Sequence, residues 1–239
     1  MNKSLLVTVT TLAALGAMAS SSTATQRGSG DFLVKVDHLV YATPDLNAGI
    51  DAIERLLGVR ATPGGQHPGQ GTRNALVALG EATYLEIIGP DPEQPKPERP
   101  RNFGIDNLKA SRLVAWVAKG TQLEQLAHDA EKSGVKLGEV ISGRRQRPDG
   151  VVLSWRYTDP RNVIADRLIP YFIDWGASPH PARTAAAGAS LISLRAQHPD
   201  AARVRLMLDR LGLDLPVQAG PQPALIATLS GPKGRVELR

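Results

Sequence analysis

The sequence has no cysteine and few aromatic residues. With Cys 0 in 239 residues, disulfide bonds, thiolate nucleophiles and cysteine-ligated zinc or iron–sulfur centres are excluded. Aromatic residues make up 4% of the chain, which argues against a surface that stacks the bases of single-stranded nucleic acid. Lys+Arg 28 exceed Asp+Glu 23, but the basic residues are scattered rather than gathered on one segment. We therefore expect no nucleic-acid partner.

Long hydrophobic runs are also lacking, except for a short one at the N-terminus. Lys3 precedes an apolar segment over residues 4–18, and small residues follow it up to Ala24. This order is typical of a secretory signal peptide, with a retained membrane anchor as the alternative. We expect residues 1–24 to be removed and the mature protein to be periplasmic or secreted. No later segment is long enough for a stable membrane span.

The rest of the chain contains a repeating pattern of strands and helices. Three amphipathic helices are each followed by a glycine, and these glycines, Gly58, Gly134 and Gly212, lie 76 and 78 residues apart. Such a constant period indicates internal duplication. A short apolar strand precedes each helix and further strands follow it. The sequence thus predicts βαβββ units over residues 32–90 and 110–181, and a shorter third unit over residues 188–239 packed on them.

This pattern places the chain in the α+β class. A single βαβββ unit leaves a bare sheet edge and one apolar face, so it pairs with a second copy. Two repeated units side by side predict a half-open barrel of mixed sheet, and its interior is the natural site for a small molecule. The third unit has no internal partner, so it flanks the barrel or pairs with a second chain as a homodimer.

Several motifs within the two complete units resemble a known superfamily. They are Asp37–Tyr41, Pro44–Leu46, the glycine-rich segment 64–74, Tyr84–Ile88 and the segment 173–181 with His180-Pro181 at its end. The chain resembles the vicinal oxygen chelate superfamily and, within it, the glyoxalase-like domain proteins. The resemblance implies the repeated barrel and a small oxygenated ligand. It also implies that residues on the first and last strands of each unit hold a divalent metal.

By this resemblance, the metal ligands of the first unit are His38 and Glu86. Strand alternation places His38 on one face of its strand, opposite Asp37 and Leu39. The second unit offers no ligand at the matching places, so His67 or His180 from a loop would have to complete the site. Two histidines and one carboxylate suit Fe, Mn, Zn or Ni. The alternatives are a buried hydrogen-bonded His38 and a Glu86 paired with an arginine.

The remaining candidates are groups that move protons or contact a ligand. The resemblance implies that Glu86 also moves protons as a catalytic group, and we predict His67 as a second catalytic acid–base group. The segment 64–74 is either an ordinary ordered loop or a lid with His67 facing the pocket. Only one of the neighbours Trp155 and Arg156 can face inwards, because successive strand residues point to opposite faces. The predicted substrate-binding residues are Arg73, Asn74, Trp155, Arg156 and His180.

A short basic cluster in the second unit has two interpretations. Arg144, Arg145 and Arg147 occur within four positions. They are either a solvated hairpin turn or an anion-binding loop at the mouth of a pocket.

Two functions from different classes fit these observations. The first is an exported metal-dependent enzyme of lyase, isomerase or oxygenase type, in which the metal stabilises an anion formed on a small oxygenated substrate. The second is a metal-free protein that binds or sequesters a small molecule in the same barrel. The missing ligands of the second unit favour the second function, and the presence of both His38 and Glu86 favours the first. The sequence leaves open whether the protein is an enzyme.

Overall fold

The protein is described by a computed structural model that covers residues 32–239. The predicted signal segment, residues 1–24, lies outside the described residues. None of the helices in the described part of the chain is long and apolar enough to cross a membrane.

The first unit has the predicted order of strand, helix and three strands, but residues 64–67 and 72–74, predicted to be a loop or a lid, belong to two paired strands. Its elements are β1 (Val36–Ala42), α2 (Leu46–Leu57), β2 (Thr62–His67), β3 (Thr72–Gly80) and β4 (Thr83–Pro90). The side chain of Asp45 accepts a hydrogen bond from the backbone N–H of Ala48 and caps α2. Gly58 ends the helix in the left-handed conformation, as the sequence predicts.

The second unit repeats this order. Its elements are β5 (Arg112–Lys119), α3 (Leu123–Lys132), β6 (Val140–Gln146), β7 (Val152–Thr158) and β8 (Tyr171–Asp174), with the short 3₁₀ helices η1 (Asn102–Asn107) before β5 and η2 (Ala165–Arg167) before β8. A third 3₁₀ helix, η3 (Pro181–Arg183), leads to the third unit. That unit contains β9 (Ser190–His198), α4 (Ala201–Arg210), β10 (Val217–Ala219), β11 (Ala224–Gly231) and β12 (Gly234–Leu238).

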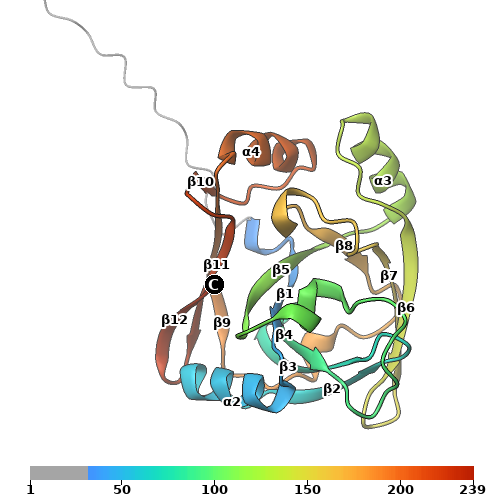
Figure 1. Cartoon of the computed structure of the whole chain (residues 1–239), viewed down its shortest axis with the longest axis vertical. Helices are drawn as coiled ribbons and strands as arrows, with labels where there is room; N and C mark the ends of the chain where they lie inside the picture. The colour runs from blue at the N-terminus through green and yellow to red at the C-terminus, as the bar shows by residue number, and fades with distance from the viewer. Residues whose placement is uncertain (1–31) are drawn as a thin grey trace, which may run out of the picture.

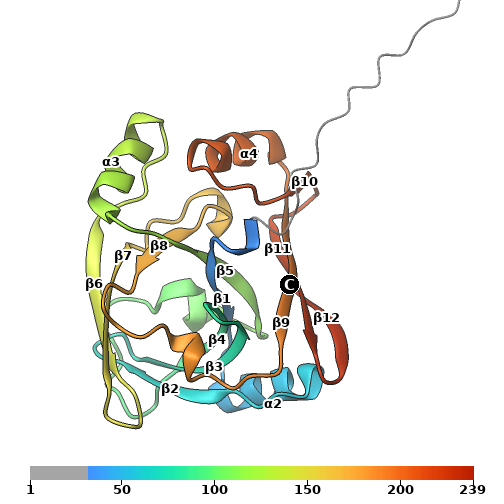
Figure 2. The same cartoon turned by 180° about the vertical axis from the view of Figure 1, so that it is seen from behind.

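The two complete units share one mixed sheet of eight strands. The strand order is β2-β3-β4-β1-β5-β8-β7-β6. Within each unit the first and last strands are parallel, and the antiparallel pair β1–β5 joins the two units. The sheet curls until its edge strands β2 and β6 approach each other (Figures 1 and 2). The predicted α+β fold with a barrel of repeated units is confirmed.

The third unit forms a separate four-stranded sheet on the opposite side from β6 (Figures 1 and 2). Its order is β10-β9-β11-β12, and α4 connects β9 to its parallel neighbour β10. In the complete units the first strand pairs with the last strand of the unit instead. The third unit therefore keeps the order of elements along the chain but has its own strand order. It contributes, with α2, to the core on the outer face of the barrel sheet.

The apolar side chains divide between the two faces of the barrel sheet. Leu39 and Trp116 belong to the large outer core, whereas Val40 and Val117 belong to a smaller inner cluster. Trp116 is fully buried, and its indole N–H donates to the backbone oxygen of Leu168. The inner face carries the polar residues described next.

Candidate functional site

A small cavity of about 60 Å³ lies inside the barrel. Both units contribute to it, because inward-facing residues of β1, β3, β4, β6, β7 and β8 all line it. Its polar lining consists of His38, His67, Asn74, Glu86, Arg145 and Tyr171, and Trp155 and Trp175 are among its aromatic walls. One water needs roughly 10–15 Å³ of such space, so the cavity holds roughly four to six non-hydrogen atoms.

A bulge in β1 brings a carboxylate to the side of His38. Val36 pairs with Ala118 and His38 with Val117, so Asp37 has no partner on β5 and the alternation of side chains is interrupted. The sequence-based assignment of Asp37 to the face opposite His38 is therefore wrong. The Asp37 carboxylate accepts a hydrogen bond of 2.7 Å from Nδ1 of His38.

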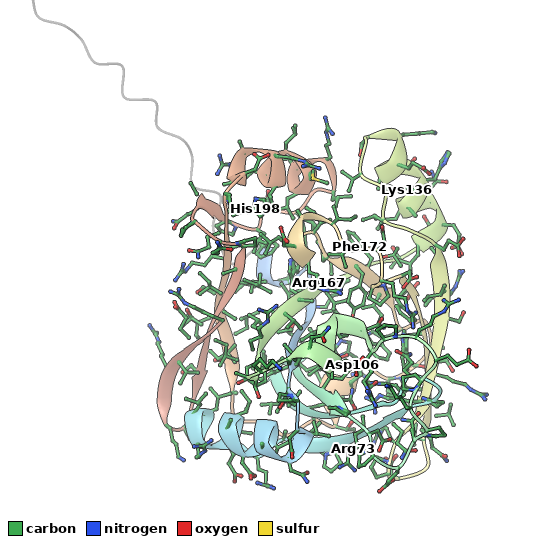
Figure 3. The ribbon with its side chains drawn as sticks, viewed as in Figure 1. Arg73, Asp106, Lys136, Arg167, Phe172 and His198 are labelled. Carbon is green, nitrogen blue, oxygen red and sulfur yellow. The ribbon has the colours of Figure 1, made fainter. Side chains whose placement is uncertain are left out.

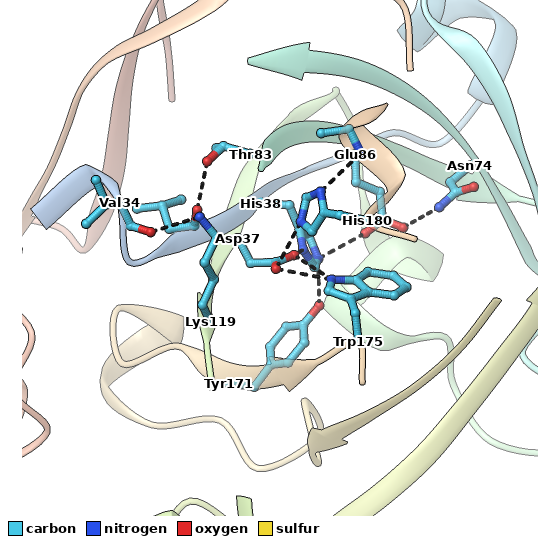
Figure 4. A network of polar contacts seen from close by, with 12 residues as sticks. Val34, Asp37, His38, Asn74, Thr83, Glu86, Lys119, Tyr171, Trp175 and His180 are labelled. Atoms are coloured by element: carbon cyan, nitrogen blue, oxygen red, sulfur yellow. Dashed lines mark hydrogen bonds and ion pairs between the residues drawn. The ribbon is translucent and has the colours of Figure 1, made fainter. Parts of the chain in front are cut away.

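Asp37 is buried and is held by three donors (Figure 4). Besides His38, the indole N–H of Trp175 donates to it at 3.1 Å, and Nε2 of His180 lies 3.2 Å from Oδ2. Burial alone would raise the pKa of Asp37, but the hydrogen bonds from His180 and His38 outweigh burial and lower the pKa to about 2. The carboxylate is therefore ionised and accepts hydrogen bonds only.

The other ring nitrogen of His38 faces the cavity. Because Asp37 takes the proton on Nδ1, Nε2 of the neutral ring carries a lone pair. The hydroxyl of Tyr171 donates to this nitrogen over 3.2 Å. Burial raises the pKa of Tyr171 well above its usual value, so the hydroxyl keeps its proton. The ring of Tyr84 stacks on His38 with 4.6 Å between centroids and fixes its plane.

A second polar cluster in the cavity is built around Glu86. The side-chain amide of Asn74 donates to Oε1 of Glu86 at 2.6 Å and lies 3.3 Å from Nε2 of His67. Nδ1 of His67 contacts the hydroxyl of Thr72 at 3.0 Å. Burial lowers the pKa of His67, which favours the neutral ring. The structure thus brings together the predicted residues His38, His67, Asn74 and Glu86.

A buried arginine completes the polar lining. Arg145 is 3% exposed, and its guanidinium donates to the backbone oxygen of Gly64. Within residues 32–239 no carboxylate forms a salt bridge with it. Burial lowers the pKa of Arg145, although an arginine side chain stays charged. The buried position of Arg145 fits the anion-binding interpretation of the basic cluster. Arg144 and Arg147 lie nearer the surface.

Three predicted ligand contacts lie outside the cavity. Arg73 (labelled in Figure 3) lies next to Asp91 and Glu93 at 4.0 Å each. Arg156 is paired with Glu124 of α3 on the exposed face of β7. His180 stands behind Asp37 rather than against the cavity. Strand alternation explains the two arginines, because their neighbours Asn74 and Trp155 face inwards instead.

The predicted site residues do not include Tyr171 or Tyr84, and they include Arg145 only through the anion-binding interpretation of the basic cluster. The two tyrosines are placed by the parallel strand pairs, whose register a single sequence does not fix. The basic cluster does contain a sequence pattern that predicts an inward-facing arginine. Arg144 and Arg145 are consecutive residues of a strand, so one of them has to face the barrel interior.

We tested the donor set against the divalent metal that the resemblance implies. Nε2 of His38 lies 3.9 Å and Nε2 of His67 3.7 Å from the oxygens of Glu86. Among residues 32–239, however, no group of three or more His, Asp or Glu side chains is arranged to hold a metal ion. Tyr171 and Asn74 occupy the nitrogens and one oxygen, and the cation of Arg145 also lines the cavity. This arrangement does not fit a divalent ion.

Comparisons with known proteins identify the family. A family model described as a glyoxalase-like domain matches residues 36–212, which is more than half of the chain. The chain belongs to the glyoxalase-like domain family. This confirms the resemblance drawn from the motifs in both complete units. No curated protein sequence matches the chain.

The solved structures that match this chain are distant from it in sequence. A hypothetical protein from Staphylococcus aureus has a TM-score of 0.57 and 13% identity, and the match covers 85% of this chain and 84% of that chain. Methylmalonyl-CoA epimerase from Mycobacterium tuberculosis gives a TM-score of 0.38 at 17% identity, covering 58% of this chain and 85% of that chain. The epimerase from Streptomyces coelicolor in complex with 2-nitronate-propionyl-CoA gives 0.42 at 17%, covering 60% and 98%. At 13% identity and a TM-score of 0.57, the likeness to the Staphylococcus aureus protein shows the fold alone.

Proposed function

We propose that this glyoxalase-like domain binds a small oxygenated anion in the barrel cavity and moves a proton on it. The observation that carries the proposal is the buried guanidinium of Arg145, which has no carboxylate partner within residues 32–239 and lines the same cavity as His38. A buried cation without a partner is costly. A carboxylate or enolate ligand would supply the missing negative charge, and the planar guanidinium of Arg145 can donate two hydrogen bonds to the oxygens of such a ligand.

His38 is the group that would accept the proton. Its Nε2 lone pair faces the cavity while Asp37 holds Nδ1–H and stabilises the imidazolium that forms. In the proposed step, the proton leaves the carbon next to the ligand's carbonyl or carboxyl group, and the electron pair of the C–H bond moves to the oxygen. Without a ligand the Tyr171 hydroxyl donates to Nε2 of His38. In the proposed complex it turns to the ligand oxygen, which frees the Nε2 lone pair, and it stabilises that oxygen together with Arg145. When that carbon carries a hydroxyl group, His38 then delivers the proton to the former carbonyl carbon, and the hydroxyl proton passes to the former carbonyl oxygen, which completes an isomerisation.

Binding is tested first, because it needs no knowledge of the reaction. Calorimetric titration uses two- and three-carbon 2-oxo and 2-hydroxy acids, which match the size of the cavity, with their uncharged amides as matched ligands. Arg145→Gln should weaken acid binding about ten- to a hundredfold, which corresponds to the roughly 1.5–3 kcal/mol of a hydrogen bond to a charged group. Arg144→Gln, on the exposed face of the same strand, is the control. Equal affinity for acids and amides, or no binding by the parent, would contradict the proposal.

Metal dependence stays a prediction of the sequence, and no step above uses a metal. It is tested by elemental analysis of protein purified without chelator and then incubated with Fe, Mn, Zn or Ni. A His38→Ala, Glu86→Ala double variant serves as the reference. Stoichiometric metal in the parent that is lost in the variant would support the metal-dependent function.

Export is also part of the proposal and is supported by the charged, apolar and small residues in order over residues 1–24. N-terminal sequencing of the protein recovered from outside the cytoplasm tests it. Cleavage after Ala19 or Ala24 is the expected result, and an intact N-terminus in the cytoplasmic fraction would contradict it.

A further inference from the structure

The network behind His38 contains two residues that no step of the proposed reaction uses. Trp175 follows β8, and His180 lies at the start of η3. Both side chains end on the carboxylate of Asp37 rather than on solvent or on the ligand cavity's polar groups (Figure 4). The carboxylate of Asp37 is 1% exposed and therefore needs hydrogen-bond donors from the protein. Trp175 and His180 supply two donors in addition to His38, and together the three fix the orientation of the carboxylate.

The hydrogen-bond pattern determines which nitrogen of each histidine carries the proton. The backbone N–H of Ala182 donates to Nδ1 of His180 at 3.2 Å. In the neutral ring, Nε2 of His180 must then carry the proton and donate it to Asp37. The indole N–H of Trp175, which can only donate, contacts both oxygens of Asp37, so both oxygens act as acceptors. Asp37 therefore takes the Nδ1 proton of His38 as well, and leaves Nε2 of His38 as the lone-pair nitrogen.

We infer that Trp175 and His180 are positioning residues that set the tautomer and orientation of His38 through Asp37. The chain of contacts runs from the Ala182 N–H through His180 and Asp37 to His38, with Trp175 as a second donor on the same carboxylate. Since the bulge at Asp37 leaves that residue outside the regular strand pairing, its side chain depends on these donors for its place. The inference rests on the proposed function for its purpose, but its geometry and test do not need a ligand.

The test reads the tautomer of His38 directly by NMR. Five histidines allow selective ¹⁵N-histidine labelling, and a His38→Gln variant assigns the signals. The parent should show one protonated and one unprotonated ring nitrogen for His38, in the Nδ1–H tautomer. In a His180→Leu, Trp175→Phe double variant, the separation between the two ¹⁵N signals should shrink as the ring samples both tautomers. Asp37→Asn shows the signals expected when control of the His38 tautomer is lost completely, because an amide no longer enforces one tautomer.

Two variants separate positioning from simple packing. His180→Gln retains a terminal N–H that can reach Asp37, so it should restore the parent signals if it keeps the fold. His198, labelled beside α4 in Figure 3, is a matched control, because its Nδ1 also accepts from the N–H two residues later while Nε2 contacts the carboxylate of Asp166. His198→Leu should leave His38 unchanged.

Either of two results would overturn the inference. One is an unaltered Nδ1–H tautomer of His38 in the folded double variant. The other is a change caused by His198→Leu as large as that caused by His180→Leu. If the double variant does not fold, the single variants Trp175→Phe and His180→Leu are compared in its place, and an unaltered tautomer in both is equally decisive. Failure of acid binding in the parent would contradict the proposed function and leave this result standing.

Discussion

Replacing Arg145 by methionine should stabilise the protein while removing its anion site. The guanidinium is 3% exposed, makes one hydrogen bond to the Gly64 carbonyl and has no salt-bridge partner within residues 32–239. Removing a charge from water costs several kcal/mol in practice, and a hydrogen bond to a charged group returns about 1.5–3 kcal/mol. Burial lowers the pKa of Arg145, so the folded state disfavours the charged form and the cost prevails.

The expected gain in the free energy of unfolding for Arg145→Met is about 1 kcal/mol, or roughly 2–4 °C in Tm for a domain of this size. Urea unfolding at pH 7 measures it. Arg144→Met on the exposed face of β6 is the control and should change stability by less than about 0.5 kcal/mol. A loss of 1 kcal/mol or more in Arg145→Met alone would refute the reasoning. Arg145 would then be a structural tie between the edge strands β2 and β6.

Three further perturbations test other parts of the structure. Gly64→Ala should destabilise the fold by about 1–3 kcal/mol in urea unfolding and weaken acid binding, because its Cβ would overlap the side-chain oxygen of Asn74. The pKa of Asp37 is about 2 in the folded state and near 4 in the unfolded state, so the ionised carboxylate stabilises the fold at pH values above about 4. The free energy of unfolding of the parent should therefore exceed that of Asp37→Asn by less and less as the pH falls from about 4 to 2. Urea unfolding at each pH measures this difference. Arg156→Ala should leave ligand affinity unchanged in calorimetry and cost less than about 1 kcal/mol, since its pair with Glu124 is exposed.

The sequence predicts the fold more fully than the site. Amphipathic helices followed by Gly58, Gly134 and Gly212 give the units and their order, because local propensity and periodicity act within a short segment. The bulge at Asp37 has no comparable local signal: it appears only when β1 is paired with β5. Alternation then misplaces Asp37, although it correctly requires that Trp155 and Arg156 face opposite ways.

The residues that the second unit contributes to the cavity are harder to predict from the sequence than those of the first unit. The resemblance directs attention to His, Glu or Gln at the places that match His38 and Glu86, and unit two has none there. The cavity instead receives Tyr171 from the strand parallel to β5, and Arg145 from the edge strand β6. Tyr and Arg are not among the His, Glu and Gln ligands that the resemblance implies, so a search for those ligands passes over both residues.

The two halves of the barrel therefore supply different chemistry to one cavity. Unit one contributes the groups that can accept or hold a proton, His38, His67 and Glu86, and unit two contributes the cation of Arg145 and the hydroxyl of Tyr171. A ligand that pairs with Arg145 while its reacting carbon contacts His38 has to contact both units.

The edge strands β2 and β6 can approach each other closely because β2 has a glycine at the contact. A Cβ on Gly65 would lie 2.5 Å from the backbone oxygen of Gln146. Opening the gap between β2 and β6 would separate the cation from the proton acceptor, and binding should then fall without any change to His38 itself.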